Sequence, residues 1–438
     1  MVQRLTVIGT GYLGATHAAC MAELGFEVLG LDVLPDRIER LAAGDLPFYE
    51  PGLPEVLRRN LENGRLRFTT SYQEIAEFGE VHFVCVGTPQ KPGEYAADVS
   101  FVDSAITSLA PLLTRECLVV GKSTVPVGTA ARVSELLRRL APSPEVELVW
   151  NPEFLREGFA VQDTLHPDRL VLGVRSEKAE RIMREVYARQ LDEGVPLVVS
   201  DFPTAELVKV SANAFLATKI SFINAMAEVC EATGADVTKL SQALSYDDRI
   251  GGKFLGPGLG FGGGCLPKDI RAFMARAGEL GVDQALSFLR EVDAINIRRR
   301  IRMVDLARDL LGGSFRGRKV CVLGAAFKPN SDDVRDSPAL DVAAEIRRQG
   351  GDVTVYDPQA LDNARKAQPA LGFGESALEA ADAADVVLLL TEWKEFRDLD
   401  PEVLGARVRE RNIVDGRNAL DPERWRAASW TYKALGRP

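Results

Sequence analysis

The chain has no long apolar run. No stretch approaches the roughly 18 consecutive apolar residues of a membrane-spanning helix. The N-terminal segment MVQRLTVIGTG has too short an apolar run for a secretory signal, and this run meets a glycine turn at once. We therefore expect a cytoplasmic protein with no membrane partner.

Cysteine and histidine are scarce. Six cysteines in 438 residues do not suggest a disulfide framework. His17, His82 and His166 lack the spacing of metal ligands, so we expect no metal site. Five cysteines lie in apolar segments and are predicted to be buried, namely Cys20, Cys85, Cys117, Cys230 and Cys321. Only Cys265 lies in a glycine-rich loop, LGFGGGCLPKDIRAF.

Clusters of basic residues are missing as well. The formal net charge is −10, which argues against nucleic acid as a partner. The contents of hydrophobic (46%) and charged (26%) residues are ordinary for a globular protein. Because 438 residues exceed one ordinary hydrophobic core, two or three domains are expected.

The first motif that is present is GTGYLG. Gly9, Gly11 and Gly14 stand between the strand-like run RLTVIG and the helical pattern ATHAACMAELG, and EVLGLDV then predicts a second strand that ends at Asp32. This βαβ pattern is typical of dinucleotide binding, with the pyrophosphate at the helix N-terminus. Asp32 suits a ribose 2′-hydroxyl and favours NAD over NADP. Arg37 leaves that preference undecided, since a nearby arginine can accommodate a 2′-phosphate.

Further strand-and-turn segments follow at 81–89, 117–129 and 146–158, each ending in Gly, Thr, Pro or Asn. In an open parallel sheet these carboxyl ends form a binding crevice. Between about 200 and 312 the pattern is helical, with Thr204 as an expected N-cap and a second helix over about 283–311. At 318 the βα alternation returns. Its turn, Gly324-Ala325-Ala326-Phe327, lacks the full glycine fingerprint, so we expect a domain that has lost dinucleotide geometry.

The predicted fold class is α/β, with two Rossmann-like doubly wound domains joined by a central long-helix region. We place an NAD-binding domain at 1–200, a central helical domain with dimer contacts at 201–312, and a second Rossmann-like domain that could still hold a nucleotide at 313–438.

Two polar residues on the first long helix are candidates for chemistry. Lys209 and Asn213 are four residues apart and share a face with Leu216 and Ile220, so this stripe is not simply solvated. A buried lysine would supply positive charge near an alkoxide, and the asparagine would orient a water or hydroxyl. The alternative is an ordinary helix surface.

Cys265 is the candidate nucleophile. If a helix begins at Pro267, Cys265 lies just before it and Asp269 lies in its first turn. The helix N-terminus and Lys268 would both favour the thiolate. Asp269 could exchange protons there, or be a plain first-turn acid.

Six motifs taken together resemble one family. The motifs occur in the order GTGYLG, STVPVGT, NPEFLREG, KVSANAFLATKI, GFGGGCLPKD and FKPNSDDVRDSP. They are similar to the UDP-glucose 6-dehydrogenase family of nucleotide-sugar dehydrogenases, and the resemblance runs from about residue 5 to residue 420. The resemblance implies oxidation of a sugar C6 alcohol to a carboxylate with two NAD per turnover. It also implies that Cys265 forms a thiohemiacetal and then a thioester, which water hydrolyses.

The resemblance further implies roles for individual residues. Lys209 and Asn213 would stabilise an oxyanion, Asp269 and Thr124 would position water and protons, and Glu153 would act as a general acid/base. The implied NAD contacts are Gly9, Gly11, Tyr12, Leu13, Gly14, Asp32, Arg37, Thr88, Thr124, Glu157, Lys268 and Arg335. The implied nucleotide-sugar contacts are Glu153, Phe154, Leu155, Arg156, Glu157, Lys209, Asn213, Phe254, Leu255, Gly256, Pro257, Gly258, Gly262, Phe327, Lys328 and Arg417. Arg249 would reach a neighbouring subunit's site, which implies a homodimer or a larger homo-oligomer.

Several alternatives stay open. Gly264 stands where many members of the family carry serine, which puts the rigidity of this loop in question. The nucleotide base is undecided between UDP and dTDP, because uracil and thymine differ by one methyl group. A two-electron hydroxyacid-type NAD dehydrogenase would need neither Cys265 nor a second α/β domain. A non-catalytic nucleotide-sugar or NAD-binding protein would not need the set of candidate catalytic residues.

Overall fold

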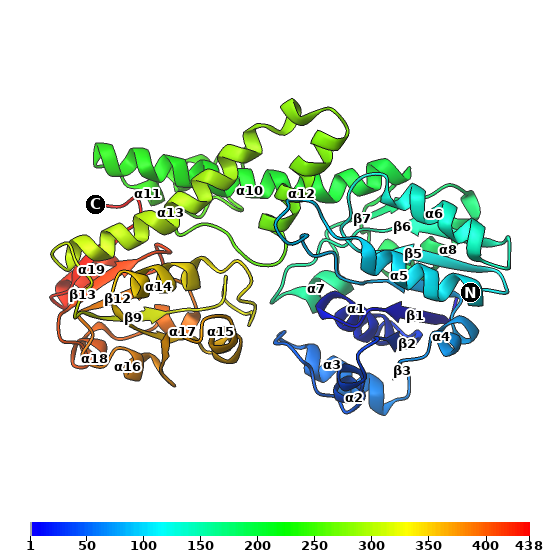
Figure 1. Ribbon diagram of the computed structural model, residues 1–438, viewed down its shortest axis with the longest axis horizontal. Helices are drawn as coiled ribbons and strands as arrows, with labels where there is room; N and C mark the ends of the chain where they lie inside the picture. The colour runs from blue at the N-terminus through cyan, green and yellow to red at the C-terminus, as the bar shows by residue number, and fades with distance from the viewer. Residues whose placement is uncertain (1) are drawn as a thin grey trace. The chain divides into compact units, whose positions relative to one another are not determined.

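The computed structural model describes residues 2–438, which divide into two compact units. The first unit contains the residues up to Ala212 together with Arg271–Gly281, and the second contains Asn213–Ile270 and Val282–Pro438. Each unit holds one open sheet with helices packed around it (Figure 1). The boundary falls inside two helices, α10 (Phe202–Thr233) and α12 (Leu266–Glu279).

The sheet of the first unit has eight strands in the order β3-β2-β1-β4-β5-β6-β7-β8. Neighbouring strands pair in parallel except β6 and β7, which meet antiparallel at Trp150 and Gly173. The strand order reverses between β1 and β4, so the carboxyl ends of these strands form the crevice typical of nucleotide-binding sheets. The strands are β1 (Arg4–Ile8), β2 (Glu27–Leu31), β3 (Leu66–Thr69), β4 (Val81–Val84), β5 (Cys117–Gly121), β6 (Val146–Trp150), β7 (Leu170–Gly173) and β8 (Leu197–Ser200).

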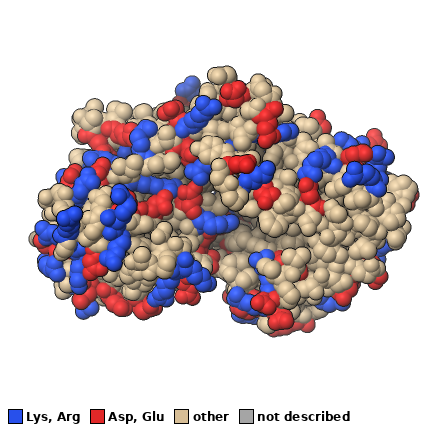
Figure 2. Space-filling model, in the orientation of Figure 1, with Lys and Arg blue, Asp and Glu red and all other residues tan. Residues whose placement is uncertain are grey.

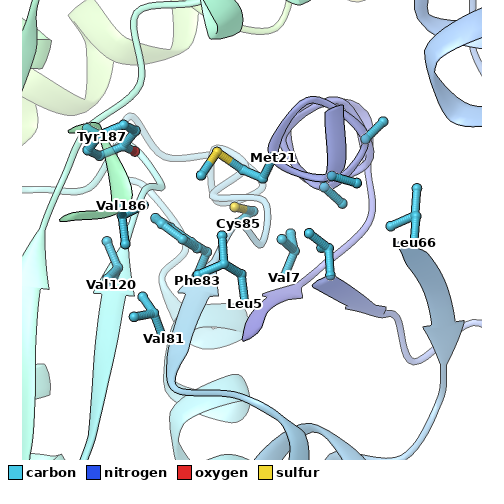
Figure 3. Close-up of a cluster of buried hydrophobic side chains, with 14 of the residues drawn as sticks. Leu5, Val7, Met21, Leu66, Val81, Phe83, Cys85, Val120, Val186 and Tyr187 are labelled. Carbon is cyan, nitrogen blue, oxygen red and sulfur yellow. The ribbon is translucent and has the colours of Figure 1, made fainter. Parts of the chain in front are cut away.

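Alternate residues of these strands face two different cores. Leu5 and Val7 of β1 join the core that includes α1, and Figure 3 shows them there with Phe83 and Val120. Ile8, one residue on, joins the opposite core with side chains of α4, α5 and α6. This alternation follows from the two-residue period of a strand. It explains why the central strands, such as β4 and β5, are buried along their whole length. The helices are α1 (Tyr12–Glu23), α2 (Pro35–Ala42), α3 (Leu53–Glu62), α4 (Tyr72–Phe78), α5 (Ser100–Leu109), η1 (Ala110–Leu112), α6 (Thr129–Leu140), α7 (Ala160–Leu165), α8 (Glu177–Val186) and α9 (Ala188–Asp192).

The long helix α10 starts three residues earlier than an N-cap at Thr204 predicts. The side chain of Asp201 accepts a hydrogen bond of 2.8 Å from the backbone N–H of Thr204. The expectation that Thr204 is the N-cap is therefore wrong, because Asp201 caps the helix by accepting from one of its first backbone N–H groups. Pro203 has no N–H and suits the first turn, where that group would have no partner within the helix. No glycine or proline follows until Gly234 (φ +74°), which ends the helix.

The remaining long helices are close to their predicted ranges. α12 begins at Leu266, one residue before the expected Pro267. The predicted helix over 283–311 divides into a short 3₁₀ turn, η2 (Asp283–Leu286), and α13 (Phe288–Leu310). α11 (Val237–Ser245) follows α10. Among residues 2–438, none of the helices combines the length and the apolar character that a membrane crossing requires.

The second unit carries a six-stranded sheet in the order β11-β10-β9-β12-β13-β14, and all its neighbouring strands are parallel. The protein therefore has two Rossmann-like domains joined by a central region of long helices, as predicted. The three-domain division at 200 and 312 stays a prediction. The elements are β9 (Lys319–Leu323), α14 (Pro338–Arg348), β10 (Asp352–Tyr356), α15 (Leu361–Ala367), β11 (Gly372–Phe373), α16 (Ala377–Ala380), β12 (Val386–Leu389), α17 (Lys394–Arg397), α18 (Pro401–Gly405), β13 (Asn412–Asp415), α19 (Pro422–Ala427) and β14 (Thr431–Ala434).

Surface charges of opposite sign lie close together. Pairs such as Arg138–Glu135 and Arg348–Glu345 join neighbouring turns of one helix. On the face that Figure 2 shows, Lys and Arg atoms are intermixed with Asp and Glu atoms. Mixed surfaces of this kind reduce long-range attraction for a polyanion.

Candidate active site

The turn between β1 and α1 has the close packing that the GTGYLG motif predicts. Gly9 has a φ of +88°, and a Cβ on Gly14 would lie 1.8 Å from the carbonyl oxygen of Gly9. Gly11 is the N-cap of α1, and a Cβ there would meet no atom within 4 Å. Gly14 is thus required by the turn itself, whereas Gly11 leaves room beside the first N–H groups of a helix, which suits a pyrophosphate.

Asp32 stands directly after β2, as predicted, and is buried. Its Oδ2 accepts hydrogen bonds from the backbone N–H of Thr10 at 3.0 Å and from Arg37 at 2.8 Å. Its Oδ1 accepts from the N–H of Leu34 at 3.2 Å. Because a carboxylate oxygen can accept two hydrogen bonds, Oδ1 retains capacity for a ribose hydroxyl. Gly11 and Asp32 together fit an NAD molecule.

The sequence did not single out Glu50, which lies in FYEPG. Its buried carboxylate accepts hydrogen bonds of 2.7 Å from the backbone N–H groups of Gly158 and Ala160, and it also accepts one from the Tyr12 hydroxyl. Burial, with Glu50 as the second cause, raises the pKa of Tyr12 well above its usual value, so this hydroxyl stays protonated and donates. Glu50 thereby connects the dinucleotide turn to the NPEFLREG segment. An acid directly before Pro-Gly was the only available signal.

Lys209 and Glu153 form a buried ion pair in the first unit. The Nζ of Lys209 lies 3.0 Å from Oε1 of Glu153, and the backbone N–H of Leu155 donates to Oε2 at 2.5 Å. Lys209 also lies 5.5 Å from the ring centre of Phe154, whose ring is covered by the guanidinium of Arg169. The predicted lysine and the predicted acid/base are therefore in direct contact, and Lys209 is on a buried stripe as expected.

Thr124 follows β5 on a loop that other side chains fix. The Thr88 hydroxyl donates to the carbonyl oxygen of Thr124 at 2.7 Å. Downstream, the carboxylate of Glu206 on α10 accepts from the backbone N–H groups of Gly128 (2.8 Å) and Ala130 (2.7 Å) at the start of α6. Glu206 caps α6 from another helix, a contact that the sequence reasoning missed.

Cys265 is the N-cap of α12, and its carbonyl oxygen accepts the first helical hydrogen bond, from Asp269, at 2.9 Å. It is the one exposed cysteine; the other five are buried, as predicted. Asp269 itself is buried and held from two sides. The Asn213 amide donates to its Oδ2 at 2.7 Å, and Lys268 donates to its Oδ1 at 2.6 Å.

The glycines before Cys265 allow close packing within the second unit. A Cβ on Gly262 would lie 2.3 Å from the carbonyl oxygen of Asp336, and one on Gly263 would lie 2.8 Å from the Phe327 ring. A Cβ on Gly264 would lie 2.3–2.5 Å from the guanidinium of Arg335. The loop is therefore held against the FKPNSDDVRDSP insertion, and Arg335 approaches closely because Gly264 has no side chain.

The predicted substrate loop, 254–258, is fixed by polar side chains. Asn224 accepts from the N–H of Gly258 at 2.9 Å, Ser241 donates to the carbonyl of Leu255 at 2.6 Å, and Asn418 donates to that of Pro257 at 3.2 Å. Phe254 holds a φ of +65°, a strained conformation for an aromatic residue.

Arg417 and Arg249 differ sharply in their surroundings. Arg417 is mostly buried, and it donates to the carbonyl oxygens of Leu390 (2.7 Å), Gly260 (2.8 Å) and Phe327 (3.2 Å). Burial lowers the pKa of Arg417 below its usual value. Arg249 is exposed and pairs with Asp247 at 2.6 Å. Among the other predicted contacts, Arg156 pairs with Asp163, and Lys328 lies over the Phe327 ring.

The second Rossmann-like turn repeats the first with one difference. Asp357 directly follows β10 and accepts from the N–H groups of Ala325 (2.8 Å) and Ala326 (3.0 Å). The indole N–H of Trp393 donates to the same oxygen at 3.0 Å. The other oxygen, Oδ1, accepts from the N–H groups of Gln359 and Ala360, both at 2.9 Å, whereas Oδ1 of Asp32 accepts one hydrogen bond, from Leu34. The oxygen that can accept a ribose hydroxyl in Asp32 therefore already has two donors in Asp357.

Three family models match consecutive parts of the chain. They are described as the NAD binding domain (residues 3–191), the central domain (203–298) and the UDP binding domain (321–422) of the UDP-glucose/GDP-mannose dehydrogenase family. Together they span most of the sequence.

Full-length relatives agree with these matches. The chain is 40% identical to a UDP-glucose 6-dehydrogenase of Rhizobium meliloti, with 99% of this chain and 100% of the relative covered. It is also 40% identical to one of Pseudomonas aeruginosa, with 99% and 98% covered. The structure of a UDP-glucose dehydrogenase from the archaeon Pyrobaculum islandicum superimposes with a TM-score of 0.92 at 37% identity, over 100% of this chain and 98% of that one. The chain is thus a member of the UDP-glucose/GDP-mannose dehydrogenase family and an NAD-dependent nucleotide-sugar dehydrogenase.

Proposed function

We propose that the protein oxidises the C6 hydroxyl of UDP-glucose to a carboxylate, giving UDP-glucuronate. The likeness over the whole length to enzymes of that name supports the substrate. The observation that carries the reaction is Cys265, an exposed thiol at the N-cap of α12, whose first turn holds the buried Asp269. A two-electron alcohol dehydrogenase has no use for such a thiol.

NAD is the oxidant, and one bound molecule accepts two electrons. The residues that would hold it in the first unit are Gly11 at the N-cap of α1, Asp32 after β2, and Tyr12, fixed by Glu50. The other proposed contacts are Gly9, Leu13, Gly14, Arg37, Thr88, Thr124, Glu157, Lys268 and Arg335.

Cys265 would act as the nucleophile. Its sulfur adds to the carbon of the sugar aldehyde and forms a thiohemiacetal, which retains a C–H bond that can be oxidised. Oxidation of that adduct leaves a thioester, and attack by water releases the acid and the thiol. The N-terminus of α12 attracts negative charge, which suits a sulfur that must act as an anion.

The polar residues divide the supporting roles. Lys209 and Asn213 would stabilise negative charge on the sugar oxygen, Glu153 would move a proton to or from water, and Asp269 and Thr124 would position water. The ion pair between Lys209 and Glu153 supports this division, because it gives the proposed acid/base a fixed position. The remaining nucleotide-sugar contacts, Arg417 and the 254–258 loop included, stay proposals, and so does the choice between UDP and dTDP.

A homodimer is part of the same proposal. On α10, Phe215, Phe222 and Val229 are exposed and follow one another at intervals of seven residues, so they lie along one face of the helix. On α13, Ile297 and Ile301 are exposed one turn apart. We propose that a second copy of this chain packs against this exposed stripe, because a regular row of apolar side chains on a long helix suits packing against another helix. A cytoplasmic location is proposed with it.

The test is the amount of NADH formed per sugar nucleotide consumed, measured in parallel with UDP-glucose, dTDP-glucose and GDP-mannose. About two NADH per sugar are expected from the thioester route, and the best substrate identifies the base. One NADH per sugar would instead support a simple alcohol dehydrogenase, and no NADH with any sugar would support a binding protein.

The variant Cys265→Ser tests the nucleophile directly. We expect UDP-glucuronate formation to fall at least about a thousandfold, because a serine hydroxyl is a much weaker nucleophile here. NAD binding, measured by calorimetry, should persist, since Cys265 is not one of the residues that would hold NAD. Unchanged turnover would rule out the cysteine route.

A further inference from the structure

Two buried polar residues occupy equivalent places after neighbouring strands of the first unit. Lys122 is the first residue after β5, and Thr124 follows two residues later. Asn151 is the first residue after β6, and Glu153 follows two residues later. The strands are in parallel register with Gly121 opposite Trp150, so Lys122 and Asn151 begin the two loops side by side.

A hydrogen-bonded cluster joins the two loops at this point. The Nζ of Lys122 donates to the side-chain oxygen of Asn151 at 3.0 Å, and the Tyr187 hydroxyl donates to the same oxygen at 2.6 Å. Lys122 lies 3.4 Å from that hydroxyl. The Asn151 amide donates to the carbonyl of Val171 at 2.9 Å, which ties the cluster to β7. Tyr187 belongs to the core on the α1 side of the sheet and is labelled in Figure 3.

Burying an ammonium group costs desolvation free energy, and folds retain such a group where an opposite charge or hydrogen bonds compensate that cost. Burial lowers the pKa of Lys122 to about 8, and Glu153 acts against that decrease. Burial also raises the pKa of the neighbouring Cys85 thiol to about 12, so that thiol is neutral near pH 7. The negative partner that Lys122 faces at neutral pH is therefore Glu153.

Lys122 and Glu153 also share a space. Both line a cavity of about 50 Å³, together with His17 and Tyr187. Glu153 is paired on its other side with Lys209 at 3.0 Å. One carboxylate thus lies in the field of two ammonium groups, from α10 and from the end of β5.

We propose that Lys122 is a positioning residue for Glu153: its hydrogen bond to Asn151 fixes the loop that carries the carboxylate, and its positive charge acts on that carboxylate within the cavity that both groups line. This inference rests on the proposed function, because it gives Glu153 the work of a general acid/base. The sequence signal is a lysine at the carboxyl end of an otherwise apolar buried strand, CLVVGK.

The charged and titratable groups around Glu153 come from several elements. They are Lys122, Lys209, Cys85, His17, Tyr187, Asp163, Asp168 and Arg169. Burial, and secondly the Lys122 charge, lower the pKa of His17 far below its usual value, so His17 is neutral and supplies no positive charge in the working range. Burial likewise keeps Tyr187 protonated by raising its pKa.

The test compares three variants of the whole protein. Lys122→Met removes both the charge and the donor, and Lys122→Gln removes the charge but keeps a donor for Asn151. Tyr187→Phe loosens the same cluster without changing any charge. Protonation of Glu153 is followed by infrared difference spectroscopy across pH, with Glu153→Gln as the reference that identifies its band.

We expect the midpoint of Glu153 protonation to move to higher pH by about one unit in Lys122→Met and Lys122→Gln, because a carboxylate that loses a nearby positive charge holds its proton more strongly. The acid limb of the kcat profile should move with it. In Tyr187→Phe, neither the midpoint of Glu153 protonation nor the acid limb of the kcat profile should move. Asn151 keeps its bond to Tyr187 in Lys122→Met, so we expect this variant to fold; if it does not, Lys122→Gln carries the comparison.

The inference and the proposed function fail in different ways. If the midpoint is the same in wild type and both lysine variants, the role of Lys122 is overturned even where UDP-glucose is oxidised. If only Lys122→Met moves the midpoint, the hydrogen bond to Asn151 supports Glu153 and the role of the Lys122 charge is overturned. If the midpoint moves in both but wild type makes no acid from UDP-glucose, Lys122 still positions Glu153 and the proposed function falls.

Discussion

At the scale of single residues, the buried histidines of the first sheet make acid stability predictable. His82 lies fully buried in β4, and its Nδ1 is 2.8 Å from the Thr6 hydroxyl. Burial lowers the pKa of His82 to about 3, and burial also lowers the pKa of His17. Both rings are therefore neutral in the fold under conditions where the unfolded chain would protonate them.

Acidification should destabilise the protein before most carboxylates titrate. Between the unfolded value of about 6.5 and the folded value of His82 near 3, the unfolded state binds more protons, so stability falls as the pH falls. We expect His82→Asn to reduce the slope of the unfolding free energy against pH by about 1.4 kcal/mol per pH unit between these two values. Guanidinium chloride unfolding at a series of pH values measures it.

Thr6→Val is the matched control for the histidine. It removes the partner of His82 but leaves the buried imidazole in place. Stability should therefore fall at every pH while the slope stays as in wild type. A His82→Asn protein with the slope of wild type would show that His82 is not the group responsible.

At the scale of elements, the turn between β1 and α1 separates two uses of glycine. Gly14→Ala should lower stability by about 1–3 kcal/mol, because its methyl group would lie 1.8 Å from the Gly9 carbonyl oxygen and α1 must shift. Gly11→Ala meets no atom within 4 Å and should leave stability nearly unchanged, while NAD binding weakens as the methyl group enters the space left for the pyrophosphate.

Calorimetry provides both measurements for the glycine pair. Thermal unfolding gives the stability of each variant, and titration gives its NAD affinity. Normal NAD affinity in Gly11→Ala would mean that the pyrophosphate does not lie at the start of α1.

Most elements could be predicted because their signals are local. The strands before Gly9 and Asp32, and those that end at Gly121 and Trp150, follow from short apolar runs that stop at turn residues. The antiparallel contact between Trp150 and Gly173 could not be predicted, since strand order depends on contacts distant in sequence. The start of α10 was missed because aspartate and threonine are both common at N-cap positions. Only the hydrogen bond from the Thr204 N–H to Asp201 shows which of the two caps the helix.

The candidate site was predictable to a smaller degree. Spacing along one helix was enough to pick Lys209 and Asn213, and both are buried. Glu50, Glu206 and Lys122 were not found, because each acts on a loop distant in sequence. Their contacts follow from the order of strands in the sheet, which no local pattern encodes.

At the scale of the whole molecule, the apolar stripe on α10 predicts self-association. Phe222→Asp would place a charge in the middle of that stripe and should weaken the dimer on the order of 30-fold or more, as loss of a central contact does. Val403→Asp, at an exposed apolar residue on α18, is the matched control and should leave the dimer intact. Sedimentation velocity over a range of concentrations distinguishes monomer from dimer.

Two other results would contradict this assignment. Wild-type protein that sediments as a monomer at micromolar concentration would exclude the stripe as a dimer contact. Equal dissociation of the Phe222 and Val403 variants would indicate a general effect of added charge.

The hydrogen bonds to Asp357 have a consequence for the order of events in one turnover. Because both oxygens of Asp357 already accept hydrogen bonds within the second domain, we expect NAD to bind at Gly11 and Asp32 alone, while oxidation of an alcohol to an acid consumes two dinucleotides. The two must therefore visit the same site one after the other. The half-oxidised sugar has to wait through that exchange, and a covalent tether to Cys265 would keep a reactive aldehyde from leaving early.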